Sequence, residues 1–247
     1  MKKINCLIFI SLIIQSSTAQ NSRFVTEGRI EFERKINLHS QISGDGLWQD
    51  EYKKALPKFQ TNYFNLLFSN NKTLYKPGRE VAENNKINNW WALPAQDNII
   101  YTDLDKQQSI SEKNLFEKYF LITDSTRKIS WKITDERKTI AGFECRRANA
   151  IIMDSIYVVA FYTDEIITPG GPESFTGLPG MILGVALPHE HITWFATKLI
   201  SIPVKETDFK IPVKGKKMNS AALKESLKES FSDWGKYADP FKKAALL

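Results

Sequence analysis

The segment His189, Glu190 and His191 has the residue types and spacing best suited to chemistry in this chain. In an extended backbone, residues two apart face the same side, so both imidazoles can bind one metal ion while Glu190 faces away. Imidazole is a good ligand for copper and zinc. The spacing therefore predicts a copper or zinc site at His189 and His191, completed by a ligand from elsewhere in the chain.

The third ligand of such a site is not fixed by the sequence. Met181, Cys145 and His39 are candidates whose positions the sequence does not give. Pro188 and the apolar strand patterns on both sides favour a hairpin tip with both imidazole rings exposed. A polar turn that happens to carry two histidines is therefore the simpler alternative.

Familiar catalytic motifs are missing from the sequence. It contains no G-x-S-x-G elbow, P-loop, G-x-G-x-x-G or H-E-x-x-H pattern. Cys145 lies in a strand pattern at residues 143–147, where packing fixes its side chain and nothing activates the thiolate. We therefore expect a protein that is not an enzyme, and a hydrolase of unrecognised type is the weakest alternative.

Four tryptophans are the candidate ligand-binding residues: Trp90, Trp91, Trp131 and Trp194. On the concave face of a curved sheet they would line a pocket for an apolar or aromatic ligand. Trp90 and Trp91 point to opposite faces if their backbone is extended, so at least one is exposed or meets a second layer. The alternative is that these side chains simply belong to the core.

The elements that position these residues are mostly strands. Residues 29–36 alternate apolar and charged side chains, and similar short patterns follow at regular spacing up to residue 202. Helical spacing of apolar residues occurs at 47–56 and again after Asn219. We expect a mainly β (α+β) protein, with a single curved antiparallel sheet or half-barrel and one or two helices packed on it.

A glycine-rich turn interrupts the strand patterns at Gly177, Leu178, Pro179 and Gly180. Each glycine can take positive φ at little cost, and the proline fixes its own φ and keeps the preceding leucine extended. The segment predicts a rigid structural turn whose apolar residues face the core. A ligand or partner surface built on the turn is the alternative.

The two ends of the sequence differ from its middle. Lys2 and Lys3, the apolar run after them and the small residues up to Ala19 are typical of a secretory signal peptide. We therefore expect an exported protein, periplasmic or associated with the outer membrane, or else extracellular. The expected divisions are a signal peptide at 1–19, a β-rich domain at 20–202, and a lysine-rich connection with a C-terminal amphipathic helix at 203–247.

Charge and hydropathy argue against a nucleic-acid partner and against a transmembrane segment. The 34 basic and 28 acidic residues give a net charge of +6, which falls to +4 without the signal's Lys2 and Lys3. This excess is modest and lacks the clustered footprint of nucleic-acid binding, so we expect no nucleic acid. No segment approaches the ~20 apolar residues of a spanning helix, so we expect no transmembrane segment in the mature chain.

Four motifs in a fixed order resemble the GLPGLI family of exported Bacteroidota proteins. The motif at 177–182 carries Met181 where the family name has leucine, and residues 131–148, 166–172 and 194–198 resemble the segments around it. The family has no agreed catalytic residues. Some members are encoded near TonB-dependent receptors, so the resemblance implies an accessory role in outer-membrane transport.

The function expected from the sequence is therefore a non-enzymatic envelope protein. It would bind a hydrophobic ligand, a peptide or an outer-membrane receptor. The alternative is a metal-binding accessory protein that uses His189 and His191 with copper or zinc.

Overall fold

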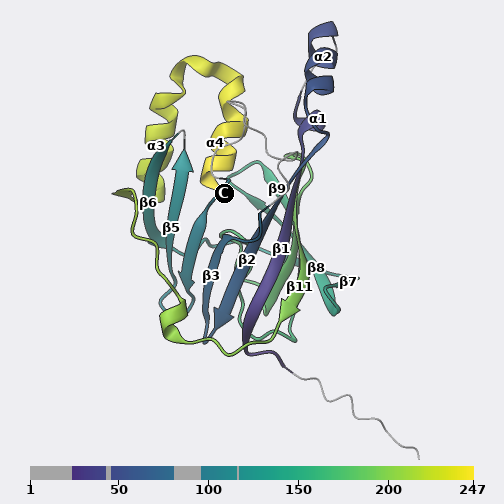
Figure 1. The fold of residues 1–247 in the computed structure, drawn as a ribbon, viewed down its shortest axis with the longest axis vertical. Coiled ribbons are helices and arrows are strands. Elements are labelled where there is room, and N and C mark those ends of the chain that lie inside the picture. The colour runs from purple at the N-terminus through teal and green to yellow at the C-terminus, as the bar shows by residue number, and fades with distance from the viewer. Residues whose placement is uncertain (1–23, 43–45, 81–95, 116) are drawn as a thin grey trace, which may run out of the picture.

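The computed structural model describes residues 24–42, 46–80, 96–115 and 117–247 (Figure 1). Trp90, Trp91 and the predicted signal peptide lie outside the described residues. Within the described part of the chain, no helix combines the length and the apolar character needed to cross a membrane.

The described strands form one 12-stranded sheet in the order β12-β6-β5-β4-β3-β2-β1-β11-β10-β9-β8-β7. Its strands are β1 (Glu27–Asn37), β2 (Phe59–Ser69), β3 (Lys72–Pro77), β4 (Ile99–Asp103), β5 (Gln108–Leu115), β6 (Lys118–Ser125), β7 (Lys132–Ile140), β8 (Phe143–Ile152), β9 (Ile156–Thr163), β10 (Met181–Leu187), β11 (Ile192–Ile200) and β12 (Lys216–Met218). Neighbours pair antiparallel, except that β12 pairs parallel with β6. The sheet is open, because β12 and β7 lie at its two ends.

Four α-helices accompany the sheet in the described residues: α1 (Leu38–Gln41), α2 (Leu47–Ala55), α3 (Ser220–Ser230) and α4 (Asp239–Leu246). The mainly β class expected from the sequence is confirmed, with more helices than the one or two expected. Figure 1 shows the sheet curving, with α3 and α4 beside one another near β5 and β6, while α2 projects away from the sheet. The face of the sheet toward α3 and α4 is called the inner face below.

Strand β1 shows why these segments form a sheet with one buried face. Its residues alternate in burial, and Ile30, Phe32 and Ile36 are fully buried. Period-two alternation places these side chains on one face of the pleat. β1 pairs with β2 on one side and β11 on the other, so it joins the two halves of the sheet.

The residues after β11 cross to the outer face of the sheet. There Phe209 packs with Leu74 of β3 and Tyr101 of β4 in a small second apolar cluster. The rings of Tyr101 and Phe209 meet edge to face, with 6.3 Å between centroids. This packing anchors the lysine-rich connection to the sheet and leads the chain to α3 on the inner face.

Candidate functional site

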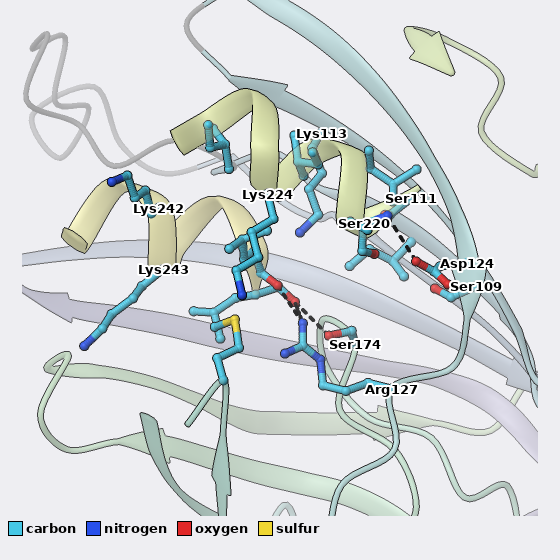
Figure 2. Close-up of a pocket in the computed structure, with 18 of the residues that line it drawn as sticks. Ser109, Ser111, Lys113, Asp124, Arg127, Ser174, Ser220, Lys224, Lys242 and Lys243 are labelled. Carbon is cyan, nitrogen blue, oxygen red and sulfur yellow. Dashed lines mark hydrogen bonds between the residues drawn. The ribbon is translucent and has the colours of Figure 1, made fainter. Parts of the chain in front are cut away.

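A cavity of about 1020 Å³ lies on the inner face between the helices α3 and α4 and the strands β4, β5 and β6 (Figure 2). Its apolar lining comes from both the sheet and the helices: Ile100, Ile122, Leu223, Leu227 and Leu246. This volume is at the upper end of the range typical of small-molecule sites.

Small side chains on β5 leave room for the cavity. The register places Ser111 between Ile100 of β4 and Ile122 of β6 on the same face. The alternation of β5 brings Ser109 and Lys113 to that face as well, and all three residues line the cavity. Two serines at the middle strand fill less space than the branched apolar residues beside them, so the helices do not close down on the sheet.

Lys113 is the buried cation of the cavity. Its side chain is enclosed, and its Nζ donates a hydrogen bond to the main-chain oxygen of Ala245 in α4 at 2.9 Å. Burial lowers the pKa of Lys113 from its usual value to about 8; the carboxylate of Glu173 acts in the opposite direction and Arg127 lowers it further. Removing an ammonium group from water disfavours its charged form, which explains the direction.

Arg127 and Ser174 bind the same turn of α4. Arg127 Nη2 donates to Leu246 O at 2.6 Å and to Leu247 O at 3.3 Å, and Ser174 Oγ donates to Leu247 O at 2.7 Å. The last carbonyls of a helix have no partners within the helix and form the negative end of its dipole. Two cations and a hydroxyl therefore satisfy the carbonyls at the end of α4, and burial lowers the pKa of Arg127.

Polar caps fix α3 above β6. The side chain of Asn219 accepts a hydrogen bond from the backbone N–H of Ala222 at 2.8 Å, as helix N-caps do. Asp124 of β6 accepts from the backbone N–H of Ser220 at 3.0 Å, and this bond lowers the pKa of the Asp124 carboxyl. The cap ties the helix to the strand that forms the cavity wall.

Basic side chains outnumber acidic ones around the cavity (Figure 2). The basic residues of the lining are Lys113, Arg127, Lys128, Lys224, Lys228, Lys242 and Lys243, and the acidic ones are Asp124, Glu225 and Asp239. Asp124 caps α3, and Glu225 is paired with Lys228 at 3.3 Å. The cavity therefore presents mainly hydrogen-bond donors and positive charge.

A second group of buried polar residues lies near Glu173. Asn98 Nδ2 donates to Glu173 Oε2 at 2.9 Å, and both side chains are buried. Arg34 is 3% exposed and lies against the Trp194 ring, with its guanidinium carbon 5.8 Å from the ring centroid. Burial raises the pKa of Tyr75, and the nearby Glu173 carboxylate raises it further. The Glu173 carboxylate also raises the pKa of Lys113, so it acts on both this group and the cavity lysine.

The tryptophans singled out in the sequence do not line this cavity where the structure describes them. Trp194 is 1% exposed and meets Phe175 edge to face, with 6.1 Å between ring centroids. Trp131 is half-buried, and its Nε1 donates to Thr176 O at 2.9 Å. Both contact the segment that leads into the glycine turn, so they belong to the packed part of the inner face.

The glycine turn directs its apolar residues inward. Gly177 has φ of 91° and Gly180 has φ of 140°. Leu178 is buried and Pro179 is exposed. A Cβ at Gly180 would lie 2.1 Å from Thr163 O, so backbone approach as well as φ requires glycine there.

His189 and His191 lie in the turn between β10 and β11, and both are exposed. His191 has φ of 57°, so the pair is not in an extended strand. Glu190 between them forms an ion pair with Lys243 of α4 at 2.8 Å. In the described ranges, no three His, Cys, Asp or Glu side chains are grouped to hold a metal ion. The copper or zinc site stays a prediction.

Sequence reasoning missed Lys113, Arg127 and Ser174. One signal was present for Lys113: the alternation at residues 108–115 puts Ser109, Ser111 and Lys113 on the face of the buried Leu115. A polar row on the inner side of a strand indicates a lined space rather than a core. Nothing local marks Arg127 and Ser174, because their partners are more than 70 residues away in sequence.

Comparison with known proteins finds a family model that matches a short segment of the chain and solved structures with a similar fold. None of the curated proteins matches the chain. Two crystal forms of PNGF-II are similar in structure, each with a TM-score of 0.53 over 81% of this chain and 32% of that chain, at 14% and 13% sequence identity. At this identity the likeness shows the fold alone, and it spans about a third of PNGF-II. Residues 151–184, which include the glycine turn, match the family model described as a protein of unknown function, Porph_ging.

Proposed function

We propose that this chain is a non-enzymatic, exported envelope protein that binds a hydrophobic or peptide ligand in the cavity between α3, α4 and β4–β6. The main support for this proposal is the cavity itself. Its volume is about 1020 Å³, and its lining combines apolar residues with two enclosed cations. A folding chain gains stability by filling such a space, so an unfilled space of this size with buried charge favours a binding role.

The chemistry of the lining supports binding over catalysis. Ser174 Oγ donates to a main-chain carbonyl, and Lys113 and Arg127 hold carbonyls of the same turn. Cys145 is fully buried, and burial raises the pKa of its thiol to about 12, so it is a poor nucleophile. In the described cavity, the cations and the hydroxyl therefore donate hydrogen bonds that hold other groups in place, which is a binding role.

Binding can be tested with the neutral apolar fluorophore N-phenylnaphthylamine. We expect a saturable rise in its fluorescence with the wild-type protein. Ser109→Trp places a large ring in the cavity and should remove at least about nine-tenths of that signal, which corresponds to about 1.4 kcal/mol of binding free energy.

Ile151→Trp is the matched control, because Ile151 is 66% exposed on β8 and does not line the cavity. It should bind the fluorophore like the wild type. Equal binding by the Ser109→Trp and Ile151→Trp proteins, with both folded by circular dichroism, would place the fluorophore elsewhere and overturn the cavity proposal.

The cellular part of the proposal is an accessory role in TonB-dependent transport at the outer membrane. It is supported by the signal-like residues 1–19 and by the resemblance of residues 131–200 to the GLPGLI family. Fractionation of cells that express the full chain tests it: the protein should be recovered in the envelope and co-purify with an outer-membrane receptor. Recovery in the cytoplasm would contradict it.

A further inference from the structure

The interior of the cavity carries more positive than negative charge. Of the basic residues that line the cavity, Lys113 is 5% exposed and Arg127 is largely enclosed. Glu173, 4% exposed, lies outside the lining, but its carboxylate raises the pKa of Lys113, and Asn98 donates to it. Buried charge is costly unless it is paired. The printed partners of Lys113 and Arg127 are main-chain oxygens of residues 245–247, and no described ion pair joins either cation to an Asp or Glu side chain.

The cations also keep unused hydrogen-bond donors. An ammonium group has three N–H donors and a guanidinium has five. In the described residues, Lys113 uses its Nζ for one bond to Ala245 O, and Arg127 uses Nη2 for two carbonyls of α4. Figure 2 shows both side chains extending toward the same space beside α4. An acceptor group on a ligand can therefore bind there while α4 stays in place.

The apolar part of the lining indicates the chemistry of the ligand beyond its acceptor group. Ile100 and Ile122 from the sheet face Leu223 and Leu227 from α3 across the cavity. This apolar surface lies next to the cations. The exposed Lys224 and the half-buried Lys242 stand at the rim, where they attract anions. The lining therefore fits a molecule with an acidic head and an apolar tail.

A peptide fits this lining less well than a hydrocarbon chain does. A bound peptide brings backbone N–H donors that need acceptors. The carboxylates of the lining are largely committed, because Asp124 caps α3 and Glu225 pairs with Lys228. A carboxylate on an acyl chain brings acceptors at one end and no donors elsewhere.

We propose that the cavity binds an amphipathic carboxylate, of the fatty-acid class, with its acid group held by Lys113 and Arg127 and its chain against the apolar lining. This inference rests on the proposed function, because it names the ligand class of the same cavity. Charge-assisted hydrogen bonds are the stronger kind, so the head group contributes both affinity and orientation.

Three probes that share a twelve-carbon chain test the head-group preference: dodecanoate, dodecanol and dodecyltrimethylammonium, each below its micellar concentration. They compete with N-phenylnaphthylamine at pH 7. We expect dodecanoate to displace the fluorophore at about tenfold lower concentration than dodecanol, and the cation to be weakest, since one charged hydrogen bond adds roughly 1.5–3 kcal/mol.

Lys113→Met keeps the length of the side chain and removes its charge. It should bring the dodecanoate and dodecanol affinities within about threefold of each other, while Lys224→Met, at the exposed rim, should keep most of the tenfold gap. If Lys113→Met does not fold, Arg127→Gln replaces it with the same expectation. Equal displacement by all three probes would overturn the inference and leave the proposed function standing. Failure of the fluorophore itself to bind would instead count against both.

Discussion

The two halves of the inner face use the same sheet in opposite ways. Beside β9, β10 and β11, the glycine turn and the residues before it cover the face, and Phe175, Leu178 and Trp194 are at most 2% exposed. Beside β4, β5 and β6, the face carries Ser109, Ser111 and Lys113 under a cavity of about 1020 Å³. One half is filled by the chain's own apolar side chains, and the other is left open and charged.

This contrast distinguishes the half of the inner face that stabilises the fold from the half that is available for function. The packed half gains stability from each buried side chain, at close to crystal-like density. The open half carries a buried lysine whose charged form is disfavoured, so it costs stability. Costs of this kind concentrate at functional sites, which is why the open half is the better candidate for binding.

The largest effect is expected at the turn that closes the packed half. Gly180→Val puts a β-branched side chain at φ of 140°, with its Cβ 2.1 Å from Thr163 O. The backbone of β9 would have to move, so we expect the free energy of unfolding to fall by about 3–5 kcal/mol. Urea denaturation followed by circular dichroism measures this change.

The control for this variant is Gly142→Val in the turn between β7 and β8. Gly142 also has positive φ, at 89°, but an added Cβ there meets nothing within 4 Å. It should cost about 1–2 kcal/mol, from backbone strain without a clash. Equal losses at the two positions would mean that the close approach to Thr163 does not matter, and the packed half would tolerate more than we argue.

Two leucines of equal burial compare the halves directly. Leu178 in the turn and Leu223 on α3 are both 2% exposed. Leu178→Ala leaves a void inside the packed half and should cost about 4 kcal/mol, whereas Leu223→Ala enlarges an existing cavity and should cost about 2 kcal/mol. Urea denaturation of both variants under the same conditions gives the difference. The reverse order would contradict the assignment of a filled and an open half.

The packed half was largely predictable from the sequence, and the open half was not. The glycines and proline at 177–180 predict a turn, and the alternation at residues 29–36 predicts a half-buried strand. Both patterns can be recognised because each lies within a few consecutive residues. The cavity depends on pairings between Lys113 and Ala245 and between Arg127 and Leu246. Such distant pairings leave no local pattern, so the sequence pointed to tryptophans and histidines, which carry the more familiar signals.

The last expected effect concerns the pH dependence of the open half. The pKa of Lys113 is lowered to about 8 in the folded protein, mainly by burial, while Glu173 raises it and Arg127 lowers it. Between pH 8 and about 10.4, the usual pKa of lysine, the unfolded chain holds a proton here that the folded protein has lost. Stability from this group therefore rises with pH in that window, by roughly 3 kcal/mol at most.

The test compares wild type with Lys113→Met in urea denaturation from pH 7 to pH 10. The wild type should gain stability relative to the variant as the pH rises, and Lys224→Met, which alters an exposed lysine, should follow the wild type. Parallel curves for the wild type and Lys113→Met would show that Lys113 is not a buried cation.

The same titration connects stability to binding in the open half. A carboxylate bound at Lys113 favours its protonated form, so by reciprocity the bound protein loses this proton at a higher pH than the free protein. Dodecanoate affinity should fall as the pH passes 8, with a midpoint above that of the free protein, whereas dodecanol affinity should not change. A dodecanoate affinity that is constant up to pH 10 would show that the charge of Lys113 does not contribute to ligand binding. The buried charge of the open half would then have a different role.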